Sequence, residues 1–185
     1  MIETLRPWVE RGVPVIGLEP SCLLGLRDEF LSMAPGVESA GLAVNAFLLE
    51  EFLAREHDAG RLDLKLTPLP EKKALLHGHC HQKAFDAMPA VRKALALVPQ
   101  LEVEAIESSC CGMAGAFGYE AAHYGVSMKM AELTLLPRVR RAAAGELIVA
   151  DGTSCRHQIR DGAGRQAIHV ARVLERALAS TSVTS

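Results

Sequence analysis

The sequence predicts an α/β fold with a mostly parallel sheet and helices on both faces. Short apolar runs alternate along the 185 residues with longer segments of helical periodicity. Strands that alternate with helices form parallel βαβ units, and helices cover both faces of such a sheet. Each of the five cysteines also lies a few residues beyond the carboxyl end of a predicted strand, at the entry to a helix. Ligands of open α/β sheets bind at that edge, so the thiols are expected to gather there.

Five apolar runs are predicted strands because they are short, rich in branched residues and bounded by turn formers. The second of them has the weakest signal. In chain order they cover residues 13–18, 62–66, 74–77, 101–106 and 147–150.

Four segments are predicted helices because their apolar residues recur with a helical period. They cover residues 41–55, 91–98, 120–144 and 166–179. The third is expected to bend or divide at Pro137 and to end at Gly145. The charged stretch 55–73 is expected to be a surface connection and an internal boundary, and residues 180–185 are expected to form a frayed tail.

The composition excludes several classes of function. Apolar residues make up 49% and charged residues 23%, as in ordinary globular proteins. The net charge of -2 and the aromatic content of 4% indicate no nucleic-acid partner. No apolar run approaches the ~18–20 residues that a transmembrane segment needs, and the N-terminus lacks the apolar core of a signal peptide. The odd number of cysteines favours metal binding or redox chemistry in a reducing cytoplasm over structural disulfides.

The cysteines form the candidate site. Cys80, Cys110, Cys111 and Cys155 occupy equivalent positions after predicted strands, and Cys22 follows the first strand in a similar turn. The dipole and free amide groups at the start of a helix stabilise a thiolate and lower its pKa. Packing explains a lone buried cysteine well, but it explains four thiols in equivalent turns poorly.

An iron–sulfur cluster is one group that these residues fit, and zinc is its competitor. Iron–sulfur clusters are usually held by four cysteine thiolates. Gly112 and Gly115 would let the backbone approach a bulky inorganic group without a side chain in the way. Zinc often takes mixtures of cysteine and histidine, which the stretch "HGHCH" offers.

The histidines of this stretch cannot all serve one site, because alternate residues of an extended segment share a face that the residues between them do not. We predict that His79 and His81 are neighbours of the site. His77 and His157 are assigned to hydrogen bonding or solvation.

Two further hypotheses need no metal. The chain could be a thiol–disulfide redox protein in which Cys110 or Cys111 pairs reversibly with a facing cysteine. A cysteine nucleophile with His81 as its base would leave three thiols unexplained. The glycines that follow the cysteine pair do not match the dinucleotide-binding pattern G-x-G-x-x-G.

Three motifs together resemble a known family. The stretches "HGHCHQKA", "SSCCGMAGAFGYE" and "VADGTSCRHQI" are similar to the cysteine-rich CCG domain that occurs in heterodisulfide reductase and in the glycolate oxidase iron–sulfur subunit. The chain is most similar to the C-terminal part of FAD-linked oxidases that carry iron–sulfur modules, because "EPSCLLGLRDEF" extends the likeness.

The resemblance also implies a domain organisation. Residues 1–55 correspond to the end of a preceding CCG-type repeat, which would contribute Cys22, and residues 73–180 to a complete repeat. The two parts are expected to pack as one globular unit, and the chain looks like a C-terminal piece of a longer polypeptide. The fullest family pattern closes with C-x-x-C, whereas Gly152 and Gln158 stand three residues before and after the last cysteine. The resemblance therefore leaves the size of the cluster open.

The resemblance implies an iron–sulfur electron-transfer domain of an FAD-linked oxidoreductase that oxidises a 2-hydroxy acid such as glycolate or lactate. A [4Fe–4S] cluster would be held by the four clustered cysteines, with Cys22 as a further candidate ligand. Gly112 and Gly115 would shape the cluster loop, and His79 and His81 would tune it.

The same resemblance specifies the partners that the domain would need. FAD would lie on a separate module, in a flavin-containing dehydrogenase domain or subunit, and an electron acceptor would complete the chain. The domain would not turn over substrate alone. It is expected in the cytoplasm, peripheral to the inner face of the membrane only through its partners. A zinc-binding structural module and a thiol–disulfide redox protein remain the alternatives.

Overall fold

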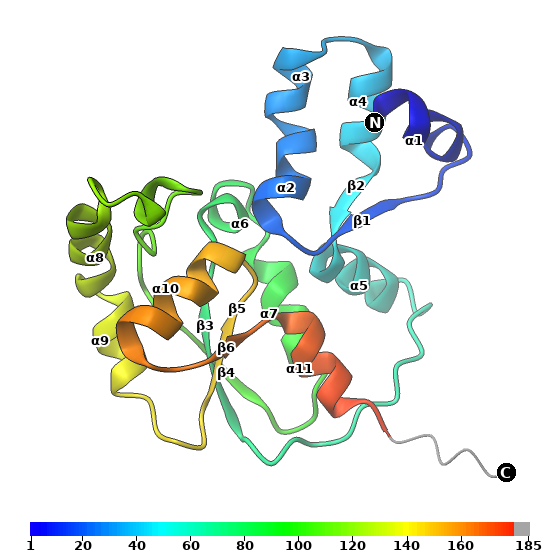
Figure 1. The fold of residues 1–185 in the computed structure, drawn as a ribbon. Coiled ribbons are helices and arrows are strands. Elements are labelled where there is room, and N and C mark those ends of the chain that lie inside the picture. Colours follow the sequence, from blue (N-terminus) through cyan, green and yellow to red (C-terminus); the bar gives the residue numbers. More distant parts are fainter. Residues whose placement is uncertain (180–185) are drawn as a thin grey trace, which may run out of the picture.

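The main part of the chain is built on a parallel sheet. The computed structural model describes residues 1–179, and within them four strands pair in parallel in the order β4 (Glu102–Ala105), β3 (Lys73–His77), β5 (Leu147–Ala150) and β6 (Ala167–Ile168). Figure 1 shows this sheet with helices on both sides. The predicted α/β class is confirmed.

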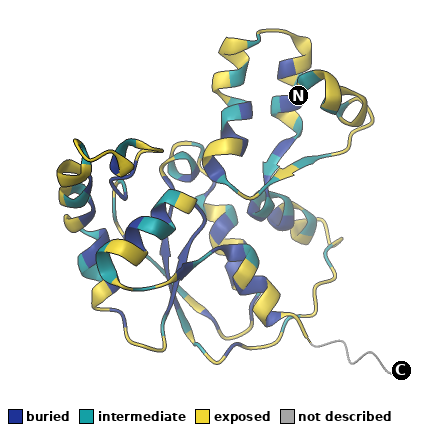
Figure 2. Ribbon diagram, viewed as in Figure 1, coloured by how far each residue is buried: buried dark blue, intermediate teal, exposed yellow. Residues whose placement is uncertain are grey.

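Two cores lie on opposite faces of the sheet because successive strand residues alternate between the faces. Leu76 and Val149 face one core, and Leu75 and Ile148 face the other. The strands are the most continuously buried part of the chain (Figure 2). The first core is covered by α5 (Leu49–Asp58), α7 (Met88–Ala96) and α11 (Val170–Ala177), and the second by α9 (Leu135–Arg140) and α10 (Thr153–Ala163).

The N-terminal residues form a smaller lobe with a core of its own, at the top of Figure 1. Two short parallel strands, β1 (Val15–Gly17) and β2 (Ala46–Leu48), lie at its base. Its helices are α1 (Ile2–Val9), α2 (Pro20–Leu24), α3 (Glu29–Met33) and α4 (Val37–Asn45). The remaining helices of the described part are α6 (Cys80–Ala84) and α8 (Tyr124–Glu132), with single 3-10 turns at Gly25–Arg27 and Phe117–Tyr119. No helix within residues 1–179 is long and apolar enough to cross a bilayer.

The small lobe repeats part of the main one. Strand β1 leads into α2 and strand β2 into α5, as β5 leads into α10 and β6 into α11. Each pair of strands is parallel. In the main sheet β5 also pairs with β3, whereas β2 is the one pairing partner of β1 in the described residues. Ile16 of β1 is correspondingly 42% exposed.

Two predicted helices are interrupted by strands that the sequence did not reveal. Segment 41–55 breaks at β2, where Ala46 and Leu48 are buried and pair with β1. Segment 166–179 begins as β6 before His169 caps the start of α11. Both strands are only two or three residues long, and pairing with a distant strand overrides the local helical pattern.

Other predicted boundaries also need correction. The run 62–66 is not a strand but supplies one isolated bridge, between Leu66 and Leu178. Segment 120–144 divides between α8 and α9 rather than at Pro137, and α9 ends before Gly145. Pro137 fits in the first turn of α9 because a backbone N–H there has no intrahelical partner. The predicted tail, 180–185, lies outside the described residues.

A buried polar cluster joins the two lobes. His169 accepts a hydrogen bond at Nδ1 from the Ala171 amide, and its Nε2 lies 2.8 Å from the Leu18 carbonyl oxygen, to which it donates. Glu50 faces His169 and Asp151, and neither of its carboxylate oxygens has a hydrogen-bond partner in the described residues. Burial, reinforced by the Asp151 charge, raises the pKa of Glu50 to about 9.

A Glu50→Gln variant is expected to show a weaker loss of stability with rising pH. The native state retains the Glu50 proton up to about pH 9, whereas the unfolded chain releases it near its ordinary pKa of 4.5. Between these values the unfolded state binds fewer protons, so the free energy of unfolding falls by up to ~1.4 kcal/mol per pH unit. Urea unfolding between pH 6 and pH 8 measures the slope. Equal slopes in the variant and the wild type would contradict a neutral, buried Glu50.

Candidate metal centre

Three adjacent strands deliver four of the cysteines to one edge of the sheet. Cys80 is the first residue of α6, directly after β3. Cys110 and Cys111 lie in the loop that follows β4, and Cys155 lies in the first turn of α10, after β5. Strands β4, β3 and β5 are neighbours, so the turns at their carboxyl ends are neighbours too.

These turns surround a pocket of about 420 Å³. Three of the cysteines line it, together with histidine, small polar and small apolar residues: Ser21, His79, Cys80, His81, Cys110, Cys111, Ala114, Gly115 and Ser154. Cys155 lies behind this wall, with its Sγ 3.3 Å from that of Cys111. Cys22 is exposed on α2 and does not line the pocket, although its neighbour Ser21 does.

The four clustered thiols divide into two kinds of acid. Hydrogen bonds from Cys111 and Cys80 lower the pKa of Cys110, and the amide of Gly112 adds a further one, with an N–Sγ distance of 3.2 Å. A hydrogen bond from Cys111 likewise lowers the pKa of Cys155 to about 5. The same bonds raise the pKa of Cys80 and Cys111, so thiols alternate with thiolates. Removing the remaining protons would place like charges side by side, which a bound cation relieves.

The Cys111 and Cys155 thiols form the inner part of the site. Both residues are almost completely buried, at 2% and 1% exposure, and both are free thiols. Cys80, by contrast, is exposed. Burial shields the inner pair from exchange with thiols in solution, while the outer pair faces the open pocket.

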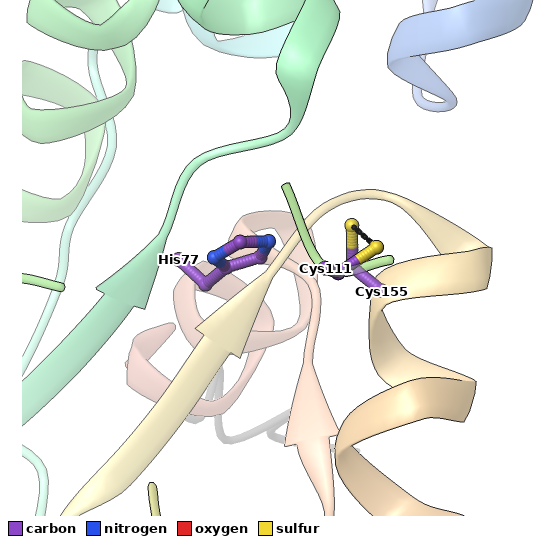
Figure 3. A group of neighbouring side chains, drawn as sticks. All are labelled: His77, Cys111 and Cys155. Carbon is purple, nitrogen blue, oxygen red and sulfur yellow. Dashed lines mark hydrogen bonds between the residues drawn. The ribbon is translucent and has the colours of Figure 1, made fainter. Parts of the chain in front are cut away.

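His77 lies beside the inner pair, where the sequence analysis did not place a site residue (Figure 3). It is completely buried, and one nitrogen of its ring and the sulfurs of Cys111 and Cys155 lie within 4.8 Å of one another. The signal was the strand alternation: Leu75 faces the core that contains Cys111 and Cys155, so His77, two residues later, faces it as well. The assignment of His77 to solvation was therefore wrong.

His79 and His81 lie on the wall of the pocket, as neighbours of the cysteines. Their rings are stacked, with centroids 5.3 Å apart. His79 caps the start of α6 by accepting a hydrogen bond at Nδ1 from the His81 amide, over 3.2 Å. Burial lowers the pKa of His79, so its ring is neutral over a wider pH range. Gln82 fixes this turn from behind by hydrogen bonds to the His79 amide and to Asp151.

The glycines have different roles in the two halves of the loop. A side chain at Gly112, whose φ is +89°, would place its Cβ 2.2 Å from the carbonyl oxygen of Ser127. The approach of α8, and not the pocket, therefore requires glycine at that position. Gly115 lines the pocket with φ +67°, and a Cβ there would meet no atom of residues 1–179 within 4 Å.

Gly152 is a site residue that sequence reasoning did not identify as one. A Cβ at this position would lie 2.4 Å from Cδ2 of His79 and 3.2 Å from Sγ of Cys155. A cysteine could not replace it without displacing the His79 ring. The other position of a closing C-x-x-C is held by Gln158, which is buried and donates to the Ser127 hydroxyl over 3.0 Å.

The residues present fit a metal group bound through sulfur. Four thiols converge, two of them favour the thiolate, and the unpartnered Nε2 of His77 lies beside the inner pair. Thiolate and imidazole are the donors that iron–sulfur clusters and zinc use in proteins. The fold and the site thus define an α/β domain with a cysteine-lined candidate metal centre.

The chain is similar to parts of two dehydrogenases. The third-lettered subunit of the anaerobic glycerol-3-phosphate dehydrogenase of Escherichia coli K12 is 31% identical over 179 residues, which are 96% of this chain and 44% of that protein. The D-2-hydroxyglutarate dehydrogenase of the same strain is 28% identical over 171 residues, 92% of this chain and 16% of the enzyme. The enzyme of that name from Pantoea ananatis is 28% identical over 165 residues, 88% of this chain and 15% of the enzyme.

The chain therefore spans less than half the length of these curated relatives. No family model and no solved structure matches it.

Proposed function

We propose that the chain is an iron–sulfur electron-transfer module of a flavin-linked dehydrogenase. The observation that carries this proposal is the convergence of Cys80, Cys110, Cys111 and Cys155 from three adjacent turns onto one open pocket. Four cysteine thiolates are the usual ligand set of a [4Fe–4S] cluster. Both groups of relatives are dehydrogenases by name, which supports an oxidoreductase.

The residues of the chain have distinct tasks in this proposal. The cluster, when bound, would supply one-electron transfer. Gly112 donates its amide hydrogen bond to the Cys110 sulfur, which stabilises negative charge there. Gly115 leaves open space on the pocket wall, and the stacked rings of His79 and His81 limit the access of water to the sulfurs. Cys80 is the exposed edge of the set, so we propose that the redox partner docks on that side.

We further propose that FAD and the organic substrate belong to a partner domain or subunit. A 2-hydroxy acid of the glycolate, lactate or hydroxyglutarate type is the substrate class that the motifs and one group of relatives favour. Glycerol 3-phosphate is the alternative that the other relative suggests. The module itself would be cytoplasmic and would reach the inner face of a membrane only through its partners.

Residues 1–55 are proposed to be the second half of a preceding repeat, and residues 73–180 a complete one. The repeated order of strand and helix supports this division, because β1 and β2 pair as β5 and β6 do. Cys22 follows β1 as Cys155 follows β5. In this arrangement Cys22 would serve the preceding repeat rather than the pocket described above.

Anaerobic reconstitution with iron and sulfide tests the proposal. We expect about four iron and four sulfide ions per chain and a broad visible absorption that dithionite bleaches. A Cys22→Ser variant should retain the iron because Cys22 lies outside the pocket. A colourless protein that holds one zinc ion and no iron after this treatment would contradict the proposal.

A zinc-binding structural module is the second candidate. The observation in its favour is the mixed nitrogen and sulfur donor set of His77, Cys111 and Cys155. Two Zn–S bonds of 2.3 Å at the tetrahedral angle place the sulfurs ~3.8 Å apart, close to the 3.3 Å between the Cys111 and Cys155 sulfurs. Metal analysis of the same reconstituted samples distinguishes the two candidates.

A further inference from the structure

We propose that His77 is a direct nitrogen ligand of the metal centre and shares one metal atom with Cys111 and Cys155. This inference rests on the proposed function to the extent that a metal group binds at these cysteines. It changes the expected ligand set from thiolates alone to a mixed set. Three observations carry it: the unpartnered imidazole nitrogen, the hydrogen bond that orients the ring, and the spacing of the three donor atoms.

The unpartnered nitrogen is Nε2 of His77. The residue is completely buried, and this nitrogen has no hydrogen-bond partner in the described residues. A buried polar atom without a partner is costly, and in native proteins such an atom often marks a ligand position. Figure 3 shows the ring at the end of β3, beside the sulfurs of Cys111 and Cys155.

The other ring nitrogen is held in the way that metal-binding histidines require. Nδ1 of His77 lies 2.8 Å from the Ser108 hydroxyl oxygen. That hydroxyl donates to the carbonyl oxygen of Ile106 over 3.5 Å. The serine oxygen is therefore free to accept the Nδ1 proton, which leaves a lone pair on Nε2. A hydrogen bond from the distal N–H commonly fixes the tautomer and orientation of a metal-bound histidine.

The spacing of the donors suits a single metal atom. The two sulfurs are 3.3 Å apart, and all three donor atoms lie within 4.8 Å of one another. Ligands of one tetrahedral metal atom stand ~3.5–3.8 Å apart when metal–sulfur and metal–nitrogen bonds are 2.3 Å and 2.0–2.1 Å. Small side-chain movements reach that geometry. Cys110 hydrogen-bonds to Cys111, so the remaining thiols adjoin this group on the pocket side.

The neighbouring histidines fit this position less well. Nδ1 of His79 already accepts a hydrogen bond from the His81 amide. His81 stacks on His79 at the pocket wall, outside the group of donors around Cys111 and Cys155. Histidine in place of cysteine raises the reduction potential of an iron–sulfur centre. The mixed ligand set would therefore make this centre easier to reduce than a cluster held by thiolates alone.

Pulsed EPR of the reduced, iron-loaded protein tests the ligand directly. Wild type labelled with ¹⁵N-histidine should show the strong nitrogen coupling of a coordinated imidazole. The coupling should survive in His81→Ala, the matched control, and vanish in His77→Ala. His77→Cys should retain iron with a lower midpoint potential, and His77→Gln checks that any loss does not arise from the polarity of the cavity alone. Circular dichroism confirms that each variant is folded.

The outcomes separate this inference from the proposed function. Bound iron without a coordinated nitrogen, or a coupling that survives in His77→Ala, would overturn the inference and leave the iron–sulfur proposal intact. If wild type holds only zinc, the electron-transfer proposal fails, and X-ray absorption at the zinc edge decides the ligand. One nitrogen that is lost in His77→Ala then supports the inference, and a shell of sulfur alone overturns it. A chain that binds neither metal overturns both.

Discussion

A Cys110→Ser, Cys111→Ser double variant is expected to lose nearly all of its iron after anaerobic reconstitution, from about four ions per chain to a small residue. The pair provides two of the four thiols, and Cys111 adjoins both Cys110 and Cys155 by hydrogen bonds. A serine hydroxyl is a harder donor with a far higher pKa, so it cannot replace a thiolate on iron. Iron and sulfide analysis with visible spectroscopy measures the loss.

The matched control for the double variant is Cys22→Ser, which makes the same chemical change on an exposed residue outside the pocket. It should bind as much iron as the wild type. Full iron binding by the double variant would disprove the ligand assignment. A loss of iron in Cys22→Ser would instead show that a fifth thiol contributes to the centre.

A Gly112→Ala variant is expected to be destabilised by about 2–4 kcal/mol, because two penalties act together. The φ of +89° is one that residues with a side chain rarely adopt, and the new Cβ would lie 2.2 Å from a backbone oxygen of Ser127. Backbone atoms of α8 cannot rotate away as a side chain can. The loop that holds Cys110 must then shift, and its hydrogen bond from the Gly112 amide is weakened.

Gly115→Ala is the control that separates the two penalties. Gly115 also has a positive φ, of +67°, but a Cβ there meets no described atom within 4 Å. It should cost about 1 kcal/mol, the ordinary penalty of a left-handed conformation for alanine. Urea unfolding of both variants gives the comparison, and iron content reports on the loop. Equal destabilisation of the two variants would contradict the steric role assigned to Ser127.

The departure from the fullest cysteine pattern has a structural counterpart in the site. The position three residues before Cys155 is Gly152, and the His79 ring occupies the space that a side chain there would need. The buried side chain of Gln158 occupies the position three residues after it and hydrogen-bonds to Ser127. Neither position can contribute a donor as the chain is built, whereas His77 brings an imidazole nitrogen to the inner thiols from the next strand.

The class of fold followed from the sequence because its two strongest signals are local. Strands such as β3 and β5 are continuous apolar runs, and their helices carry a clear apolar stripe. Strands β2 and β6 were missed because each is only two or three residues long. Such short strands exist through pairing with β1 and β5, which lie far away in the sequence or carry no marker of the pairing.

The sequence by itself determined that the protein has an α/β fold and that four cysteines sit at the ends of its strands, because strand runs and the residues beyond them are contiguous in the chain. Tertiary structure alone decided how these residues meet. It joined Cys111 to Cys155, turned His77 toward them, left Cys22 outside the pocket and gave Gly112 its steric role. The physical reason is that the face a residue presents depends on strand register and on neighbours distant in sequence.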